Sequence, residues 1–393
     1  MEDAEIEKAG ILVLDKCRVC GGGNGRLHSV SSELPIHIWP LPAGKKNAYL
    51  DAGHFVCGDC GHVQLQSMSD EFIDFLYEEE YFVLEDSALD KHRIQSLVDI
   101  FGREVIEGAR LLDVGGGNNP IAGPVSELGY KCESWVVDIN PKPLAAEVAT
   151  KVVRGRFEDA ELPQGYFDLA TSFFSMEHFN NPPEIIARMA EVLKPGGLVA
   201  VEVPNLSGLI DFAPHYLTFH QHVSIFSVSS LDNLFSLQGF RRKTMIHEDA
   251  AIYLVYENVH GPKELSAPGI DPWVEMDRFR ARMADIGSRI QALELPEGEG
   301  KIGIYAAGGS TSLFLANFPW LRERISMAFD RDTRKHGRVI PGSQIKVHGP
   351  QDIDSSGIEI LLFLDDGIHK AVSPDVRVKC LSLGHILSIG ETQ

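Results

Sequence analysis

Three consecutive glycines directly after an apolar segment form the most informative pattern in the chain. Gly115, Gly116 and Gly117 follow the segment 111–114, which contains Asp113. Glycines at this point let the backbone turn sharply, so that a ligand can lie against it. Asp138 ends the next apolar segment, where a carboxylate can accept hydrogen bonds from both hydroxyls of a ribose. The pattern predicts a site for a nucleotide-type cofactor.

Two close pairs of cysteines lie near the N-terminus. Cys17 and Cys20 form one pair, Cys57 and Cys60 form the other, and a glycine follows each pair. Two such pairs can supply four sulfur ligands to a tetrahedral zinc ion. A zinc ion with four thiolate ligands has no open position for a substrate, so we expect a structural metal. The alternative is a set of four buried or redox-active thiols.

Histidines form a further group with possible chemistry. His222 ends the sequence Phe-His-Gln-His that begins at Phe219, and His178 directly follows a glutamate. Histidine changes its charge near neutral pH, which suits a general base. Clustered histidines also cap loops and satisfy backbone groups. Both interpretations stay open for His222, and we favour catalysis.

The glycine turn belongs to a longer series of features. After Asp138 come Phe157, Glu158 and Asp159, then Phe-Asp-Leu at 167–169 and Leu-Lys-Pro-Gly-Gly at 193–197. In this order the features resemble class I S-adenosylmethionine-dependent methyltransferases. The resemblance implies S-adenosylmethionine as the cofactor, with Glu158 or Asp159 contacting the adenine amino group beside Phe157. A nicotinamide-binding domain is the alternative.

A second resemblance covers nearly the whole chain. A two-knuckle zinc domain, a methyltransferase core and a small C-terminal α/β domain resemble the three-domain zinc-containing methyltransferases that alkylate carbon of nucleotide-linked 4-keto deoxysugars. The resemblance implies that His222 is the base and that His178 faces the acceptor. The same family usually has tyrosine and glutamate where this chain has Phe219 and Gln221, which places its usual mechanism in doubt here. Tyr81 lies where relatives contribute an aromatic hydroxyl to the acceptor pocket, although packing against the core is an equal alternative.

A second glycine turn lies in the C-terminal part. Gly308 and Gly309 follow an apolar segment and precede a helical one, and Asp330 stands about twenty residues further on. The turn is equally compatible with a purely structural role. In the light of the resemblance we expect it to hold the nucleotide of a sugar substrate, with Lys335 and Arg338 near the phosphates.

The elements that must position these residues alternate between strand and helix. Such alternation is typical of an α/β fold with a parallel sheet covered on both faces. We therefore predict a class I methyltransferase Rossmann-like core at 69–260, an N-terminal zinc-binding domain at 1–68 and a small C-terminal α/β domain at 261–393. Expected strands are 110–114, 133–138, 151–153, 167–174, 197–203, 302–306, 326–330 and 359–364, and helices include 183–193, 273–295 and 310–317.

Composition limits the possible partners. The chain has 393 residues, 44% of them hydrophobic, and a formal net charge of -20. Such a charge repels a phosphate backbone, and the dense basic cluster at 241–243 is expected to be a solvated turn, so we expect no nucleic-acid partner. No apolar run approaches the roughly 20 residues that cross a membrane. We expect a cytoplasmic protein with a small-molecule acceptor and no membrane partner.

Three functions follow from these patterns. The leading hypothesis is methylation of carbon in a nucleotide-linked keto deoxysugar through an enolate. The second is O- or N-methylation of a related acceptor, a chemistry that does not need the residues altered at Phe219 and Gln221. The third is a noncatalytic assembly protein that keeps the cofactor fold.

Overall fold

The computed structural model describes residues 15–45, 47–65, 87–117, 119–261, 264–298 and 300–388. Its strands form three sheets of four, seven and five strands. Tyr81 and the predicted boundary between residues 68 and 69 lie outside the described residues. Among the described helices, none is long and apolar enough to cross a membrane.

The seven-stranded sheet is the centre of the predicted methyltransferase core. The strand order is β10-β11-β8-β7-β4-β5-β6. Strands β4 to β8 run parallel, whereas β11 is antiparallel to both β8 and β10. Since the carboxyl ends of the parallel strands meet at one edge, residues that follow different strands are brought together there. The strands are β4 (Arg110–Val114), β5 (Glu133–Asp138), β6 (Lys151–Arg154), β7 (Phe167–Phe173), β8 (Leu193–Pro204), β10 (Phe240–Glu248) and β11 (Ala251–Asn258).

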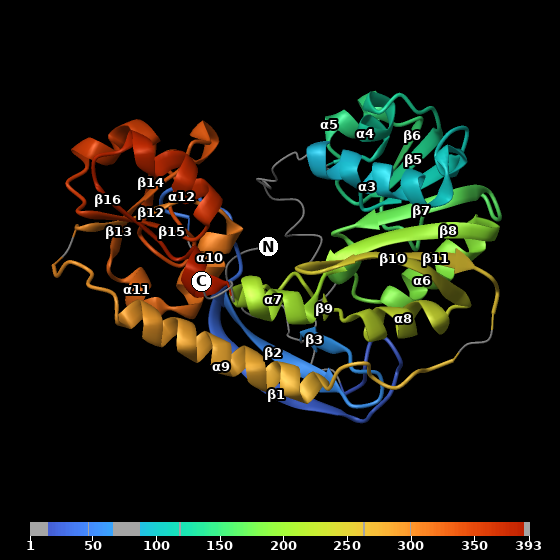
Figure 1. Cartoon of the computed structure of the whole chain (residues 1–393), viewed down its shortest axis with the longest axis horizontal. Helices are drawn as coiled ribbons and strands as arrows, with labels where there is room; N and C mark the ends of the chain where they lie inside the picture. Colours follow the sequence, from blue (N-terminus) through green and yellow to red (C-terminus); the bar gives the residue numbers. More distant parts are fainter. Residues whose placement is uncertain are drawn as a thin grey trace.

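Helices pack on both faces of this sheet (Figure 1). In α6 a proline occupies the first turn, where its missing N–H is not needed. Ile185, Ile186, Met189 and Val192 of α6 recur at helical spacing and are buried. This apolar stripe fixes α6 against the sheet. The helices are α3 (Ser87–Phe101), α4 (Ala122–Glu127), α5 (Pro143–Val148), α6 (Pro182–Val192) and α8 (Val228–Ser236), with the 3-10 helices η1 (Arg103–Val105) and η2 (Met176–His178).

The four-stranded antiparallel sheet joins the N-terminal region to the core. Its order is β1-β2-β3-β9, where β1 is Gly25–Pro35, β2 is Tyr49–Cys57 and β3 is Val63–Leu65. The fourth strand, β9 (Ser224–Ile225), comes from the central part of the chain and pairs with β3. Helices α7 (Leu206–Phe212) and η3 (Pro214–Thr218) precede β9, and the long helix α9 (Pro272–Gln291) runs along β1 and β2 (Figure 1).

The five-stranded sheet of the C-terminal region is parallel throughout, in the order β14-β13-β12-β15-β16. It occupies a lobe separate from the seven-stranded sheet (Figure 1). Its strands are β12 (Ile302–Tyr305), β13 (Ile325–Phe329), β14 (Lys346–His348), β15 (Ile360–Phe363) and β16 (Lys379–Ser382). The accompanying helices are α10 (Gly309–Asn317), α11 (Pro319–Arg322), η4 (Thr333–Lys335), η5 (Pro350–Ser355), α12 (Asp366–Val372), η6 (Ser373–Asp375) and α13 (Gly384–Leu387).

The basic cluster at 241–243 was expected in a solvated turn, and this prediction is wrong. The cluster lies within the edge strand β10. Arg241 and Lys243 each contact Glu257 of β11, at 3.0 and 3.1 Å, and Arg242 contacts Asp232 of α8 at 2.9 Å. Each basic side chain thus has a carboxylate partner on a neighbouring element, and exposed charged side chains are common on edge strands.

Candidate active site

The glycine turn after β4 is shaped by close approaches that other residues would prevent. Gly115 has a φ of 79°, and a Cβ atom there would lie 1.9 Å from the Ser175 hydroxyl oxygen. At Gly117 a Cβ atom would lie 2.4 Å from Cγ of Asp138. The turn therefore requires glycine both for its conformation and for the nearness of the carboxylate after β5.

Two carboxylates hold this turn in place. Asp113 accepts hydrogen bonds from the Thr171 hydroxyl at 2.9 Å and from the backbone N–H of Ile121 at 3.0 Å. Burial raises the pKa of Asp113 to about 6. Asp138 accepts from the backbone N–H groups of Gly117 at 3.1 Å and of Asn140 at 2.7 Å, and burial raises its pKa as well.

A cavity of about 490 Å³ opens at the turn. The predicted cofactor residues that line it are Asp113, Gly115, Gly116, Asp138, Phe157 and Glu158, and His178 lines it as well. Gly117 is not among the lining residues, although its N–H donates to Asp138. Glu158 lies 3.6 Å from Arg156, whereas Asp159 is exposed and does not line the cavity. Contact of either carboxylate with adenine stays a prediction.

Sequence reasoning missed several residues of the cavity wall. Asn140 lies two residues after Asp138, so its place could have been inferred from the strand end. Arg93 of α3 also lines the cavity and forms ion pairs with Asp90 and Glu202. No local pattern around Arg93 indicates this position, because packing of α3 against β8 brings the charges together.

The two predicted catalytic histidines lie side by side. The rings of His178 and His222 are T-shaped, with centroids 4.9 Å apart. Nδ1 of His178 is 2.9 Å from the backbone carbonyl of Gln221, which fixes the ring. Nε2 of His178 and Nε2 of His222 lie 3.9 and 4.0 Å from Oε1 of Glu177. The sequence reasoning gave no role to Glu177, although it directly precedes His178.

Burial controls the charges of this group. It lowers the pKa of His178 to about 4, and it lowers the pKa of His222 well below its usual value, with repulsion from His178 and His220 adding to the effect. Burial raises the pKa of Glu177 to about 8. Both histidines are therefore uncharged at neutral pH, which leaves a ring nitrogen able to accept a proton.

Phe219 and Gln221 each contact one of the two histidines. The Phe219 ring lies 4.6 Å from the His222 ring and packs against Ile38 and Leu313, which come from the N-terminal and C-terminal regions. Gln221 is buried and holds His178 through its backbone. The three regions of the chain thus meet beside the histidine pair.

The C-terminal glycine turn has a different environment. A Cβ atom on Gly309 would lie 2.7 Å from Ile38, and one on Gly308 would lie 3.8 Å from Trp39, so the N-terminal region covers this turn. Lys335 pairs with Asp330 at 2.8 Å. Arg338 donates to the backbone carbonyl of Pro40 at 3.4 Å. Phosphate binding by these residues stays a prediction.

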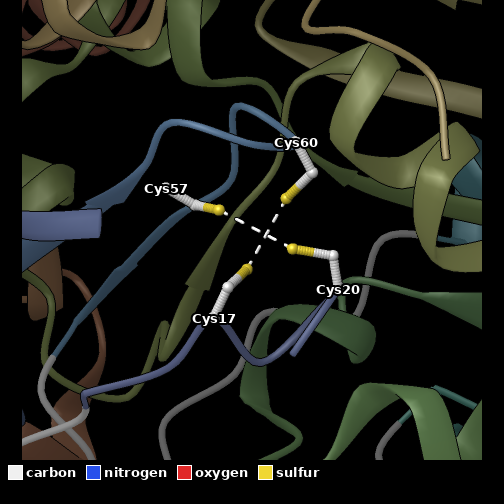
Figure 2. Close-up of side chains that lie close together, drawn as sticks. All are labelled: Cys17, Cys20, Cys57 and Cys60. Carbon is white, nitrogen blue, oxygen red and sulfur yellow. Dashed lines mark hydrogen bonds between the residues drawn. The ribbon is translucent and has the colours of Figure 1, made fainter. Parts of the chain in front are cut away.

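The four cysteines gather as predicted (Figure 2). Sγ of Cys17 is 3.5 Å from Sγ of Cys60, and Sγ of Cys20 is 3.7 Å from Sγ of Cys57. Four sulfurs around a tetrahedral zinc ion, with zinc–sulfur bonds of roughly 2.3 Å, lie about 3.8 Å apart. The arrangement is compatible with zinc, and the identity of the metal stays a prediction.

Comparison with known proteins bears on the central region. Residues 88–243 match the family model of a methyltransferase domain. The chain is an S-adenosylmethionine-dependent methyltransferase. This enzyme is 25% identical to the C-methyltransferase NovU of Streptomyces niveus over 373 residues, which cover 86% of each chain.

Two further similarities each cover part of the enzyme. The ubiquinone/menaquinone biosynthesis C-methyltransferase UbiE of Cupriavidus metallidurans is 31% identical over 119 residues, or 28% of this chain. That match spans about half, 49%, of the relative's own length. A solved S-adenosylmethionine-dependent methyltransferase of Thermotoga maritima, described as a possible histamine N-methyltransferase, is 16% identical with a TM-score of 0.35, covering 43% of this chain and 92% of that one.

Proposed function

We propose that the enzyme transfers a methyl group from S-adenosylmethionine to carbon of a nucleotide-linked keto deoxysugar. The observation that carries the proposal is the pair of uncharged histidines, His178 and His222, beside the cavity of the glycine turn. Similarity to a C-methyltransferase over most of the chain supports the choice of carbon. The three-part organisation of the sequence supports the sugar acceptor.

In this proposal the cavity orients the cofactor. Asp138 accepts hydrogen bonds from the ribose hydroxyls, and Glu158 contacts the adenine amino group next to Phe157. The turn at 115–117 lies against the remainder of the cofactor, where glycine allows close approach. S-adenosylmethionine supplies a methyl group on a positively charged sulfur. The thiolate cluster holds a structural zinc ion away from the reaction.

The reaction requires a base. His222 takes a proton from the carbon beside the ketone, and the electrons of the broken carbon–hydrogen bond form an enolate. The enolate carbon then bonds to the methyl group while the methyl–sulfur bond breaks and its electron pair returns to sulfur. His178 positions the acceptor, and the proton on His222 leaves to solvent after transfer.

The test is turnover of methyl-labelled S-adenosylmethionine with nucleotide-linked 4-keto sugars and with their reduced alcohols. We expect label on carbon of the keto compounds, and loss of roughly 10²–10⁴-fold in kcat for His222→Ala, as for other general bases. His385→Ala is the matched control, because His385 lies exposed on α13. Full activity of His222→Ala would overturn the assignment of the base.

A second candidate is O- or N-methylation of a related acceptor. It is favoured by Phe219, whose apolar ring beside His222 offers no hydroxyl to steady an enolate oxygen. Label on oxygen or nitrogen of the reduced alcohols or related amines, with none on carbon, would select this chemistry. Tight cofactor binding without turnover of any acceptor would instead indicate the assembly protein.

A further inference from the structure

Glu177 is an ionisable residue buried without an ordinary partner. Its side chain is 2% exposed, and neither carboxylate oxygen has a hydrogen-bond partner in the described part of the chain. An unsatisfied carboxyl group costs free energy in a protein interior, so such a group is uncommon unless it has a use. The 3-10 helix η2 at the end of β7 holds Glu177 in this position.

The carboxylate faces both histidines of the proposed site. Oε1 of Glu177 lies 3.9 Å from Nε2 of His178 and 4.0 Å from Nε2 of His222. His178 is already fixed through Nδ1 by the carbonyl of Gln221. The backbone N–H of His222 donates to the carbonyl of Phe219 at 2.9 Å, which holds the turn that carries the second ring.

Other charged groups surround Glu177 from several elements. Glu202 of β8 raises its pKa and Arg93 of α3 lowers it, after the larger effect of burial. Arg93 is itself paired with Asp90 and Glu202, and His247 of β10 lies 3.3 Å from Glu202. His220 lowers the pKa of His222 after the larger effects of burial and His178.

Glu177 supplies a carboxylate that residue 221 lacks. Residue 221, directly before His222, is a glutamine, whose side-chain amide cannot supply a carboxylate. Glu177 offers a carboxylate to the same histidine from a different element.

We propose that Glu177 is the positioning residue for His222: its carboxylate accepts the Nε2–H of the ring and leaves Nδ1 to take the proton from the acceptor. This inference rests on the proposed function. The nitrogen–oxygen distance must shorten by roughly 1 Å to form a hydrogen bond, whose usual length is about 2.7–3.2 Å. When Nδ1 receives the acceptor proton, the carboxylate stabilises the resulting imidazolium.

The ionisation of Glu177 provides a signature that a merely structural carboxyl would lack. Because its pKa is raised to about 8, the carboxyl is mostly protonated at neutral pH and becomes charged as the pH rises. A positive sulfonium in the adjacent cavity favours the charged form. The rate of methyl transfer should therefore rise with pH while His222 stays uncharged.

The experiment measures kcat and KM on the keto acceptor between pH 6 and 9.5, with the cysteine cluster loaded with zinc. For wild type we expect kcat to rise with a midpoint below about pH 8, because the bound sulfonium favours the charged carboxylate. Glu177→Gln should match wild type near pH 6, lack this rise, and be roughly 10–100-fold slower at pH 9, as for other residues that orient a functional histidine. The KM for S-adenosylmethionine should not change.

Rescue separates orientation from packing. Gln221→Glu in the Glu177→Gln background should restore part of the rate at high pH, and Glu177→Asp should keep a pH-dependent rise at a lower rate. An unchanged pH profile in Glu177→Gln would overturn the inference. So would a rate abolished by chelation and restored by Mn²⁺ in zinc-loaded wild type, because a cation would then bridge Glu177 and the histidines.

A second measurement does not depend on turnover or on the folding of a variant. Nitrogen-15 NMR of histidine-labelled wild type above pH 8, where the Glu177 carboxyl is charged and accepts, should show His222 as the Nε2–H tautomer. The Nδ1–H tautomer would overturn the inference even if carbon methylation is observed. Absence of carbon methylation in wild type would overturn the proposed function instead, and the tautomer would still decide whether Glu177 orients His222.

Discussion

The two glycine turns of the chain have similar local structure but different surroundings. After β4, Asp138 accepts a hydrogen bond from Gly117, and a cavity opens over the turn. After β12, Asp330 accepts a hydrogen bond from Ala307 at 2.8 Å, but Ile38 and Trp39 lie over the turn. A strand, a glycine turn and a following aspartate therefore describe a backbone arrangement, and the rest of the chain decides whether a ligand can reach it.

Replacing a glycine of each turn by a larger residue should give the largest difference between the two turns in cofactor affinity. Gly117→Val places atoms within the space of the Asp138 carboxylate, so we expect at least a 100-fold loss of S-adenosylmethionine affinity. Gly309→Ala places a Cβ atom 2.7 Å from Ile38, which should destabilise the fold by about 1–3 kcal/mol, as overpacking does. Calorimetric cofactor binding and thermal unfolding measure the two effects. Weakened cofactor binding by Gly309→Ala would contradict the comparison.

Removing each aspartate should separate a ligand contact from a structural pair. Asp138→Ala should weaken S-adenosylmethionine binding by roughly 10–100-fold, because hydrogen bonds to a charged group contribute about 1.5–3 kcal/mol each. Asp330→Ala leaves Lys335 largely buried without its partner and should lower the free energy of unfolding by about 3 kcal/mol. Titration calorimetry and urea unfolding distinguish these results. Equal losses of cofactor affinity would show that the turns do not differ as described.

Trp39→Ala tests the cover over the second turn. Loss of the indole removes packing against Gly308 and Gly309, so we expect a several-fold change in KM for the nucleotide-linked acceptor. The KM for S-adenosylmethionine should remain unchanged, because the cavity at the first turn does not include Trp39. Steady-state kinetics with each substrate varied in turn provides the measurement. A change confined to the cofactor would contradict the separation of the two turns.

The smallest effect concerns the pH dependence of stability at the first turn. Burial raises the pKa of Asp113 to about 6, above its usual value of 3.8. Between these values the folded protein binds more protons than the unfolded chain, so this group lowers stability as the pH rises. Asp113→Asn cannot ionise, and its melting temperature should improve relative to wild type from pH 4 to 6. A constant difference across this range would show that Asp113 does not titrate with a raised pKa.

Helices and strands were predictable where the apolar pattern of the sequence ends at the same residues as the element. An apolar run before the glycines predicted Arg110–Val114, and the structure has the same bounds for β4. The strand from Leu193 was predicted four residues late, because Lys-Pro-Gly-Gly is usually a turn and here extends β8. The antiparallel pair β10 and β11 was not predicted. Its formation depends on pairing with β8 rather than on any distinctive local periodicity.

The site was predictable only in part for the same reason. Asp138 follows its strand at a recognisable distance, and the paired cysteines have a recognisable spacing. Glu177 beside His222 and Trp39 above Gly308 are contacts between distant segments. Such contacts depend on how the sheets pack, which the sequence pattern does not specify.

The sheet that contains β9 brings the cysteine cluster close to the segment that carries His222. Arg18 lies between Cys17 and Cys20, and its guanidinium donates to the backbone carbonyl of Val223, the residue after His222. The loop that carries Cys17 and Cys20 therefore holds the segment at His222 and Val223, about two hundred residues further along the chain. If the cluster holds a metal ion as proposed, its removal should leave the cavity at the glycine turn in place and displace the segment that carries His222. Product formation would then fall before cofactor binding does.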